Sequence, residues 1–333
     1  MNSKRIRNGL TIALFAMTGL TPVFTMAPYV IFVLNSVCIN IILVLALNFI
    51  LGFAGQVFLG TIAFFAIASY TFGLLFAKLG WGFWGSLPVT IAVTALMSFL
   101  MGIPTLRIRG AYLALMSLGF IIVVGDVIKN WMSFTGGVWG ISSIPRPFLG
   151  SFALTQNLHM FYLCLAFAFL LAWTALLIED SRYGRAFKAV RDDQLAVELA
   201  GISSTYVKVL AFTLCGVYTG VAGALFASFN AYISPDIYNF NYNSIFLCML
   251  VVGGLSSVPG SVLGAILLTV AIELLRPLRE KYLTFFALFI ILILLFEPGG
   301  LVVYIEGFFK KLFGPWRLSR ETPDVIEKGR PIE

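Results

Sequence analysis

Long apolar stretches follow one another along most of this chain, with short polar segments between them. Ten apolar runs fall near residues 10–27, 28–51, 60–77, 86–103, 111–128, 158–178, 209–229, 244–257, 261–275 and 283–296. About 20 apolar residues in a helix span the hydrocarbon core of a bilayer, so most of these runs are long enough to cross a membrane. The pattern predicts an all-α polytopic membrane protein with about ten transmembrane helices, and with eight at the fewest.

Two parts of this pattern allow more than one interpretation. The eighth and ninth runs are short and are separated by SSVPG (256–260), so residues 244–275 form either two tilted helices or one broken helix. The first run follows three basic residues and ends in FTMA (24–27), which resembles the end of a signal peptide. A second apolar run follows at once, which favours an uncleaved first transmembrane helix.

Composition supports this fold class and removes several functions. Soluble domains are about 45–50% apolar and about 25% charged, whereas this chain is 60% apolar and 11% charged, with a mean hydropathy of +0.97. The four cysteines lie inside apolar runs, and His159 is the only histidine. We therefore expect no disulfide framework, no metal site, no bound cofactor and no enzymatic activity of the chain's own.

The basic residues indicate the orientation in the membrane, because loops rich in Lys and Arg stay in the cytoplasm. A cytoplasmic N-terminus places 16 of the 22 Lys and Arg residues on the cytoplasmic side. An even number of spans then returns the chain to the same side. We expect a transmembrane domain over residues 1–305 and a basic cytoplasmic tail over residues 306–333, with both termini inside.

Residues 179–208 (EDSRYGRAFKAVRDDQLAVELAGISSTYVK) hold ten of the chain's 37 charged residues and lie on the predicted cytoplasmic side. Either Asp192 or Asp193 can cap a short helix over QLAVELA (194–200), and Gly201 is the expected left-handed residue beyond its end. The window is either a solvated loop that follows the rule for positive charge or a helix that docks a cytoplasmic partner.

Other charged residues are expected at the membrane surface. Upstream of the short helix, the basic residues that we place near anionic headgroups are Arg185, Lys188 and Arg191. The acidic residues in or near spans all lie close to predicted span ends, where we expect an interfacial position; they are Asp126, Glu273 and Glu297. No chain of acids suggests a proton relay, which counts against a proton-coupled carrier.

Glycine-rich breaks interrupt two of the apolar stretches. GQVFLGT (55–61) lacks the lysine of a phosphate-binding loop, so any ATP must be hydrolysed by another chain. Glycines at membrane depth, with no charged residue nearby, allow close helix packing or a broken helix that lines a cavity, and GGLSSVPG (253–260) has the same character. The two breaks suggest an internal repeat with the translocation pathway between its halves, although small-residue packing explains them equally well. The candidate pathway residues are Gly52, Gly55, Gln56, Gly60, Gly253, Gly254, Ser256 and Ser257.

Several longer motifs resemble those of one family of membrane proteins. They are LNFILGFAGQVFLGTIAFFAIASYTFGLL (47–75), LRIRGAYLALMSLGF (106–120), TGGVWGISSIP (135–145), SRYGRAFKAVRDDQLAVELAGI (181–202), GALFASFNAYISPD (223–236), VVGGLSSVPGSVLGA (251–265) and LLFEPGGL (294–301). In this order they resemble the permease subunits of branched-chain amino acid ABC importers, and in particular the longer of the two paralogous permeases. Urea and short-chain amide importers share most of these motifs.

The resemblance implies a permease in the inner (plasma) membrane of a bacterium that translocates leucine, isoleucine and valine by alternating access. It also implies a second homologous permease, two cytoplasmic ATPase subunits and a periplasmic or lipid-anchored binding protein, with membrane lipid around them and no nucleic acid. In that family the loop before the seventh span places a helix in a cleft of the ATPase. The residues that would couple to the ATPase are therefore Arg185, Asp192, Asp193, Glu198 and Gly201. The alternatives are a urea or amide importer and a self-sufficient secondary carrier.

Overall fold

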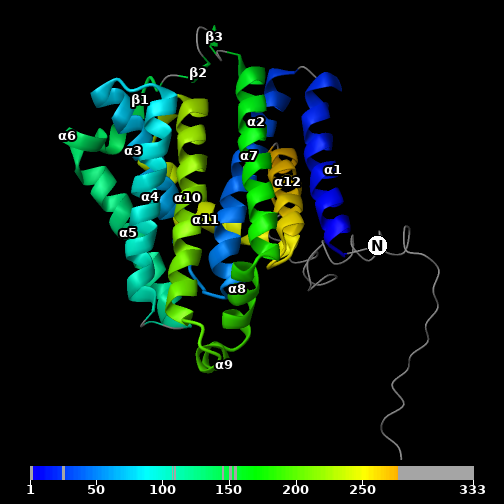
Figure 1. Ribbon diagram of the computed structural model, residues 1–333. Coiled ribbons are helices and arrows are strands. Elements are labelled where there is room, and N and C mark those ends of the chain that lie inside the picture. The colour runs from blue at the N-terminus through cyan, green and yellow to red at the C-terminus, as the bar shows by residue number, and fades with distance from the viewer. Residues whose placement is uncertain are drawn as a thin grey trace, which may run out of the picture.

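The chain folds into a bundle of long helices that stand roughly side by side, with small strands at one end (Figure 1). The computed structural model describes residues 3–24, 27–106, 108, 110–144, 146–149, 152–153 and 156–276. The tenth expected span (283–296), Glu297 and the expected tail (306–333) lie outside these residues. Within the described residues the all-α class is confirmed, since helices form most of the chain and each strand has only two residues.

The elements follow one another with short connections. The α-helices are α1 (Ser3–Phe24), α2 (Pro28–Leu47), α3 (Thr61–Leu79), α4 (Phe83–Thr105), α5 (Ala111–Asn130), α6 (Met132–Thr135), α7 (Asn157–Asp180), α8 (Arg182–Asp192), α9 (Gln194–Leu199), α10 (Ser204–Asn230), α11 (Phe240–Gly253) and α12 (Val258–Leu275). A wide π-helical turn, η1 (Asn48–Phe53), continues α2, and two short 3-10 turns are η2 (Gly137–Trp139) and η3 (Pro235–Ile237). The strands are β1 (Ile141–Ser142), β2 (Phe148–Leu149), β3 (Phe152–Ala153) and β4 (Tyr232–Ile233).

Seven helices of the described residues are long and apolar enough to cross a membrane: α2 with η1, α3, α4, α5, α7, α10 and α12. Two further helices are not among these seven. Helix α11 is apolar but has only 14 residues, and α1 is long enough but less apolar, because Arg7 and Asn8 lie in its second turn. These nine helices correspond to nine of the ten expected spans. The open question about residues 244–275 is settled in favour of two helices, because α11 ends at Gly253 and α12 begins at Val258.

The molecule has two distinct ends. Helices α8 and α9 lie at the end where α1 begins, which we call the α8 end, and β1, β2 and β3 lie at the other, which we call the strand end (Figure 1). Antiparallel pairing of β1 with β4 joins the loop after α5 to the loop after α10. The basic side chains described at the α8 end are Arg7, Arg182, Arg185, Lys188, Arg191 and Lys208, and those at the strand end are Lys78, Lys129, Arg146 and Arg276. The positive-inside rule predicted the first group on the cytoplasmic side and the second group on the outer side, and the structure separates the two groups in the same way.

Helices α2 and α10 form the centre of the bundle. Residues 41–50 of α2 and η1 are buried without interruption, and a helix that is apolar on all sides is expected to be surrounded by other helices. Helix α2 contacts α7, α10, α11 and α12, while α10 contacts α3 and α4. The two helices therefore join the two sides of the bundle.

Glycines let α10 approach its neighbours at backbone distance. A Cβ added to Gly220 would lie 2.9 Å from the Cα of Ile91 on α4, and one added to Gly223 would lie 2.3 Å from the Cβ of Ala68 on α3. Small residues at such contacts are typical of membrane helices, where close van der Waals packing replaces the hydrophobic effect as the force of association.

The same device joins α11 to α12. A Cβ on Gly253 would lie 2.1 Å from the carbonyl oxygen of Gly260, and a Cβ on Gly264 would lie 1.9 Å from the carbonyl oxygen of Met249. These neighbours are backbone atoms, which cannot turn aside as a side chain can. The two helices consequently form a tight hairpin.

We expect Gly264→Ala to destabilise the protein and Gly119→Ala to leave it unchanged or slightly more stable. The first substitution forces α12 away from α11, and overpacking of this kind costs about 1–3 kcal/mol. Gly119 lies on α5 with no atom within 4 Å of an added Cβ, so the new methyl group only improves helix propensity by about 1 kcal/mol. Thermal unfolding of the two variants in the same detergent measures the difference. Equal midpoints would show that the α11–α12 contact yields without cost.

Candidate functional site

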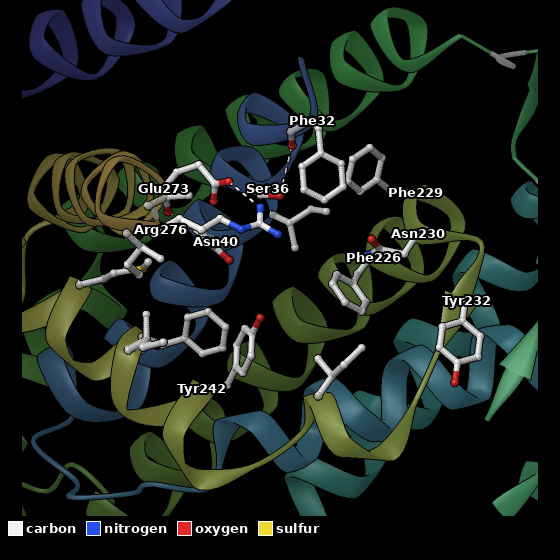
Figure 2. Close-up of a pocket in the computed structure, with 17 residues that line it drawn as sticks. Phe32, Ser36, Asn40, Phe226, Phe229, Asn230, Tyr232, Tyr242, Glu273 and Arg276 are labelled. Atoms are coloured by element: carbon white, nitrogen blue, oxygen red, sulfur yellow. Dashed lines mark hydrogen bonds and ion pairs between the residues drawn. The ribbon is translucent and has the colours of Figure 1, made fainter. Parts of the chain in front are cut away.

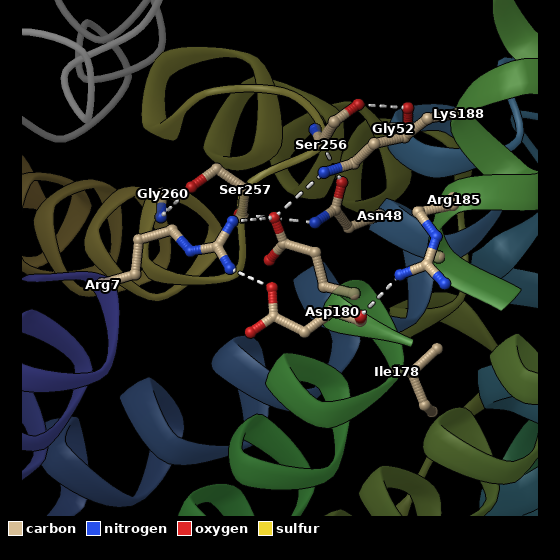
Figure 3. A network of polar contacts seen from close by, with 12 residues as sticks. Arg7, Asn48, Gly52, Ile178, Asp180, Arg185, Lys188, Ser256, Ser257 and Gly260 are labelled. Carbon is tan, nitrogen blue, oxygen red and sulfur yellow. Dashed lines mark hydrogen bonds and ion pairs between the residues drawn. The ribbon is translucent and has the colours of Figure 1, made fainter. Parts of the chain in front are cut away.

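The two predicted glycine breaks meet at the α8 end of the bundle. The Oδ1 atom of Asn48 accepts a hydrogen bond from the backbone N–H of Ser256 at 3.1 Å, and its Nδ2 donates to the carbonyl of Ser257 at 3.4 Å. A Cβ on Gly52 would lie 1.7 Å from the same Asn48 oxygen, so only glycine fits there. Figure 3 shows Asn48 and Gly52 beside Ser256 and Ser257. We call this contact between η1 and the α11–α12 break the helix-break joint.

Arg191 of α8 bonds to both sides of the helix-break joint. Its guanidinium donates to the carbonyl of Gly52 at 2.9 Å and also to the hydroxyl of Ser256, which itself donates to that carbonyl. The stem of Arg191 packs on Gly55, where an added Cβ would lie 2.7 Å from its Cγ. Gly55 has φ +65°, a conformation that glycine adopts most readily. One side chain of residues 179–208 thus links the two breaks.

These contacts correct one expectation from the sequence. The break around Gly52 and Gly55 is not free of charge, since a guanidinium lies against it. Lys188 and Arg191 both bond to oxygen atoms of the bundle, a carboxylate and a carbonyl. Arg185 is exposed, and it donates to the backbone carbonyl of Asp180 at 3.3 Å.

A buried ion cluster lies beside the helix-break joint. The side chain of Glu179 is 2% exposed and binds Arg7 at 2.8 Å and Lys188 at 3.2 Å. Arg7 also binds Asp180 (Figure 3). Breaking a buried ion pair by removing one partner typically costs about 3–5 kcal/mol, so the cluster fixes α1 and α8 to the end of α7. The sequence did not indicate this cluster, because Arg7 and Glu179 are 172 positions apart.

The predicted capping pattern of residues 179–208 is present. Asp193, and not Asp192, caps α9 by accepting from the backbone N–H groups of Leu195 and Ala196 at 2.9 and 3.1 Å. Gly201 has φ +82° just beyond the helix, as expected, with no atom within 4 Å of an added Cβ. Residues 179–208 also include the eleven-residue helix α8, which contains the basic residues Arg185, Lys188 and Arg191.

A polar network attaches α9 to α10. The carboxylate of Glu198 accepts from Gln194 Nε2 at 2.8 Å and from the hydroxyl of Ser204. Lys208 Nζ donates to Gln194 Oε1 at 2.8 Å. Glu198 is therefore bound by its own chain, whereas Asp192 is exposed on the surface. The five predicted coupling residues lie on one end of the molecule without forming a cluster.

Helix α9 presents apolar side chains at this charged end. Leu195 is 67% exposed, Leu199 is 82% exposed, and Ile202 follows beyond the helix with 43% exposure. The two leucines are four positions apart and therefore lie on one face of the helix. Exposed apolar side chains that gather on one surface are typical of a contact with another protein or with a membrane.

The remaining pathway candidates lie around the helix-break joint or away from it. Gly253 and Gly254 lead into the α11–α12 break, where Gly254 has φ +121°. The Gln56 side chain donates to the carbonyl of Ala54 at 3.4 Å. Gly60 lies apart from the helix-break joint. A Cβ on Gly60 would lie 2.6 Å from the ring of Phe58 and would meet none of the joint residues within the three nearest contacts. The structure thus brings four of the eight candidates together, namely Gly52, Gly55, Ser256 and Ser257.

A cavity of about 580 Å³ lies between α2, α10, α11 and α12, toward the strand end (Figure 2). None of the eight pathway candidates lines it. Its lining includes Glu273, which the sequence placed only near a span end. The cavity depends on side chains from four separate helices, so no local motif in the sequence could have indicated it.

Comparison with known proteins agrees with this architecture. Residues 29–296 match the family described as "Branched-chain amino acid transport system / permease component". The chain is 34% identical to the high-affinity branched-chain amino acid transport system permease protein LivM of Escherichia coli (strain K12), and also to LivM of Salmonella typhimurium (strain LT2). Each alignment covers 79% of this chain and 68% of the relative.

More distant likeness extends to two other permeases. Identity is 30% to LivH of Salmonella typhimurium, over 53% of this chain and 59% of the relative. It is also 30% to the autoinducer 2 import system permease protein LsrC of Yersinia pseudotuberculosis, over 64% of this chain and 56% of the relative. The seven long apolar helices and the match over most of the sequence lead to one conclusion. The chain is a multi-pass membrane protein that belongs to the family of permease components of branched-chain amino acid transport systems.

Proposed function

We propose that this chain is one of two homologous permeases in an ATP-driven importer that carries leucine, isoleucine and valine across the bacterial inner membrane. The similarity to LivM supports the substrate class, and the weaker similarity to LivH supports a paralogous partner permease. Two cytoplasmic ATPase subunits and a periplasmic or lipid-anchored binding protein complete the complex. The chain itself supplies the pathway and no chemistry.

The observation that carries this proposal is the contact of Arg191 with both helix breaks. Movement of α8 pulls on the carbonyl of Gly52 and the hydroxyl of Ser256 together, because one guanidinium binds both. ATP-driven closure of the ATPases displaces α8 and α9, and η1 and the α11–α12 hairpin then move relative to each other. This motion opens the pathway alternately to the two sides of the membrane.

The α8 end is the cytoplasmic side in this proposal. The concentration of basic side chains there supports this orientation. The exposed leucines of α9 fit a cleft in the ATPase, and the exposed Arg185 and Asp192 supply charge at the rim of that contact. Asp193, Glu198 and Gly201 act indirectly, by fixing the position of α9.

In this proposal the cavity forms the part of the pathway toward the strand end, and the helix-break joint forms the part at the α8 end. Both involve α2, α11 and α12, with the cavity toward the strand end and the helix-break joint at the α8 end. The helix-break joint closes the cytoplasmic end of the pathway while the cavity faces outward. Gly52, Gly55, Ser256 and Ser257 form the closure.

We expect ATP-dependent uptake of labelled leucine by the reconstituted complex, and a loss of at least tenfold with Arg191→Met. Methionine keeps an apolar stem over Gly55 but removes the donors to Gly52 and Ser256, and hydrogen bonds of charged groups are worth about 1.5–3 kcal/mol. Arg182→Met is the matched control, because Arg182 is exposed on the same helix.

Each outcome of this measurement has a defined meaning. Uptake of urea in place of leucine would assign the chain to an amide importer, and uptake without any ATPase would make it a secondary carrier. Wild-type uptake with Arg191→Met would show that force does not pass through the helix-break joint. An equal loss with Arg182→Met would give the same conclusion, because the effect would then belong to α8 as a whole.

Cysteine labelling measures the orientation. We expect a cysteine at Ala200 to react with an impermeant reagent only from the cytoplasmic side, and a cysteine at Ser142 only from the outside, since both positions are exposed. Cys38, Cys164 and Cys215 are buried, so the unmodified chain provides the background signal. Labelling of Ala200 from outside would reverse the orientation and remove the ATPase from α9.

Gly201→Val should uncouple ATP hydrolysis from transport while the chain still inserts. A left-handed residue with a Cβ costs about 1–2 kcal/mol, and this strain turns α9 away from its partner. Gly80→Val is a matched control, because Gly80 also has positive φ (+64°) and open space around it but lies at the strand end. ATP hydrolysis stimulated by loaded binding protein is the measurement. Normal stimulation with Gly201→Val would show that the position of α9 does not couple ATP hydrolysis to transport.

A further inference from the structure

The cavity toward the strand end has a mostly apolar wall. Its volume of about 580 Å³ lies in the range of sites that hold small organic ligands, about 300–1,000 Å³. Aromatic rings from α2, α10 and α11 surround it (Figure 2), and the largest of these belong to Phe32, Phe226, Phe229, Tyr242 and Phe246. Aliphatic side chains from α11 and α12 complete the wall. Such a wall suits a branched or aromatic hydrocarbon group.

An ion pair lies at one side of this apolar wall. Arg276 and Glu273 are one turn apart at the end of α12, with Nη1 and Oε1 separated by 2.7 Å. The hydroxyl of Tyr29 donates to the same Glu273 carboxylate. Figure 2 shows the guanidinium of Arg276 extending over the cavity toward Ser36. The Glu273 side chain is 20% exposed and that of Arg276 is 65% exposed, so both remain accessible to a molecule in the cavity.

Further polar groups lie deeper in the cavity. Asn40 Nδ2 donates to Thr269 Oγ1 at 2.9 Å, which joins α2 to α12 at its inner side. Figure 2 shows the hydroxyl of Tyr242 directed into the space from the opposite wall. The polar groups are therefore few and convergent, as they are in sites that fix the orientation of an apolar ligand.

The charges of this lining select a particular class of molecule. One cation and one anion side by side match a molecule that carries one of each, whereas an ion of single sign would leave one member of the pair opposed by like charge. Urea carries neither a charge for the pair nor a hydrocarbon group for the rings. An α-amino acid has an ammonium and a carboxylate on the same carbon, beside its side chain.

We propose that this cavity is a transient binding site for a zwitterionic α-amino acid with an apolar side chain. Arg276 binds the carboxylate, Glu273 binds the ammonium, and the rings of Phe32, Phe226 and Phe229 contact the side chain. The inference rests on the proposed function and extends it, because it makes the permease itself, and not only the binding protein, discriminate amino acids from urea. The partly exposed ion pair allows the ligand to leave again.

The test is photolabelling of the assembled, reconstituted complex with a diazirine analogue of leucine. After irradiation and proteolysis, we expect mass spectrometry to find the label on cavity residues of α2, α10 or α11. An excess of leucine should reduce the label at least tenfold, and the same concentration of urea should leave it unchanged. This measurement uses the unmodified chain and does not depend on the folding of a variant.

Two substitutions then test the ion pair. Glu273→Gln and Arg276→Gln each remove one charge and keep a polar side chain, with the glutamine at 273 also matching glutamate in size, so both should lower cavity labelling and leucine uptake at least fivefold. Lys129→Gln is the control, because Lys129 forms an ion pair of similar length with Asp236, 2.9 Å, at the same end but outside the cavity. It should change cavity labelling by less than twofold.

The outcomes separate this inference from the proposed function. If the unmodified complex takes up leucine with ATP but the label falls outside the cavity, or if urea competes as well as leucine, the site is overturned and the importer stands. Unchanged labelling in both glutamine variants would overturn the role of the ion pair. If the unmodified complex takes up no leucine, the proposed function fails and the site fails with it.

Discussion

The end of η1 and the turn between α11 and α12 lie at the same end of the bundle, and each backbone group that no helix bonds there must find another partner. Within a membrane no water replaces a missing hydrogen bond. Asn48 meets this need on one side by bonding to the backbone of Ser256 and Ser257. Arg191 meets it on the other by binding the carbonyl of Gly52. The ends of α2, α8, α11 and α12 are consequently held in one place.

Close packing at glycines makes this arrangement possible. The asparagine amide occupies the space that a Cβ on Gly52 would need, and the arginine stem occupies the space beside Gly55. The same residue type holds α12 against α11 at Gly264. The contact at Gly264 is with backbone atoms, which cannot turn aside, whereas those at Gly52 and Gly55 are with side chains that the hydrogen bonds of the helix-break joint hold in place.

The sequence predicted the features that depend on local chemistry. The apolar runs located nine described helices, and the capping residues located Asp193 and Gly201 correctly, because caps require particular residue types at fixed spacing. The two breaks were recognised from their glycines. The sequence did not indicate that the two breaks contact each other, because Asn48 and Ser256 are 208 positions apart.

Long-range electrostatics explains what the sequence did not indicate around α8. The positive-inside rule describes loops and not the individual partners of a side chain. Glu179 is buried at the end of α7, so it draws Lys188 inward, and the open carbonyl of Gly52 does the same for Arg191. Partners of this kind are found only when the helices are placed in three dimensions.

Helix α2, with its continuation η1, also connects the two ends of the molecule. Helices α2 and α12 each carry a polar group of the cavity, Asn40 and Thr269, which are bonded to each other. Eight residues beyond Asn40, the same helix reaches Asn48 in the helix-break joint, a distance of roughly 12 Å at 1.5 Å per residue. Residues 41–50 are buried without a gap, so this stretch of α2 and η1 is packed on all sides. In the proposed mechanism a displacement of Arg191 therefore acts on the same stretch of chain that reaches the wall of the cavity at Asn40.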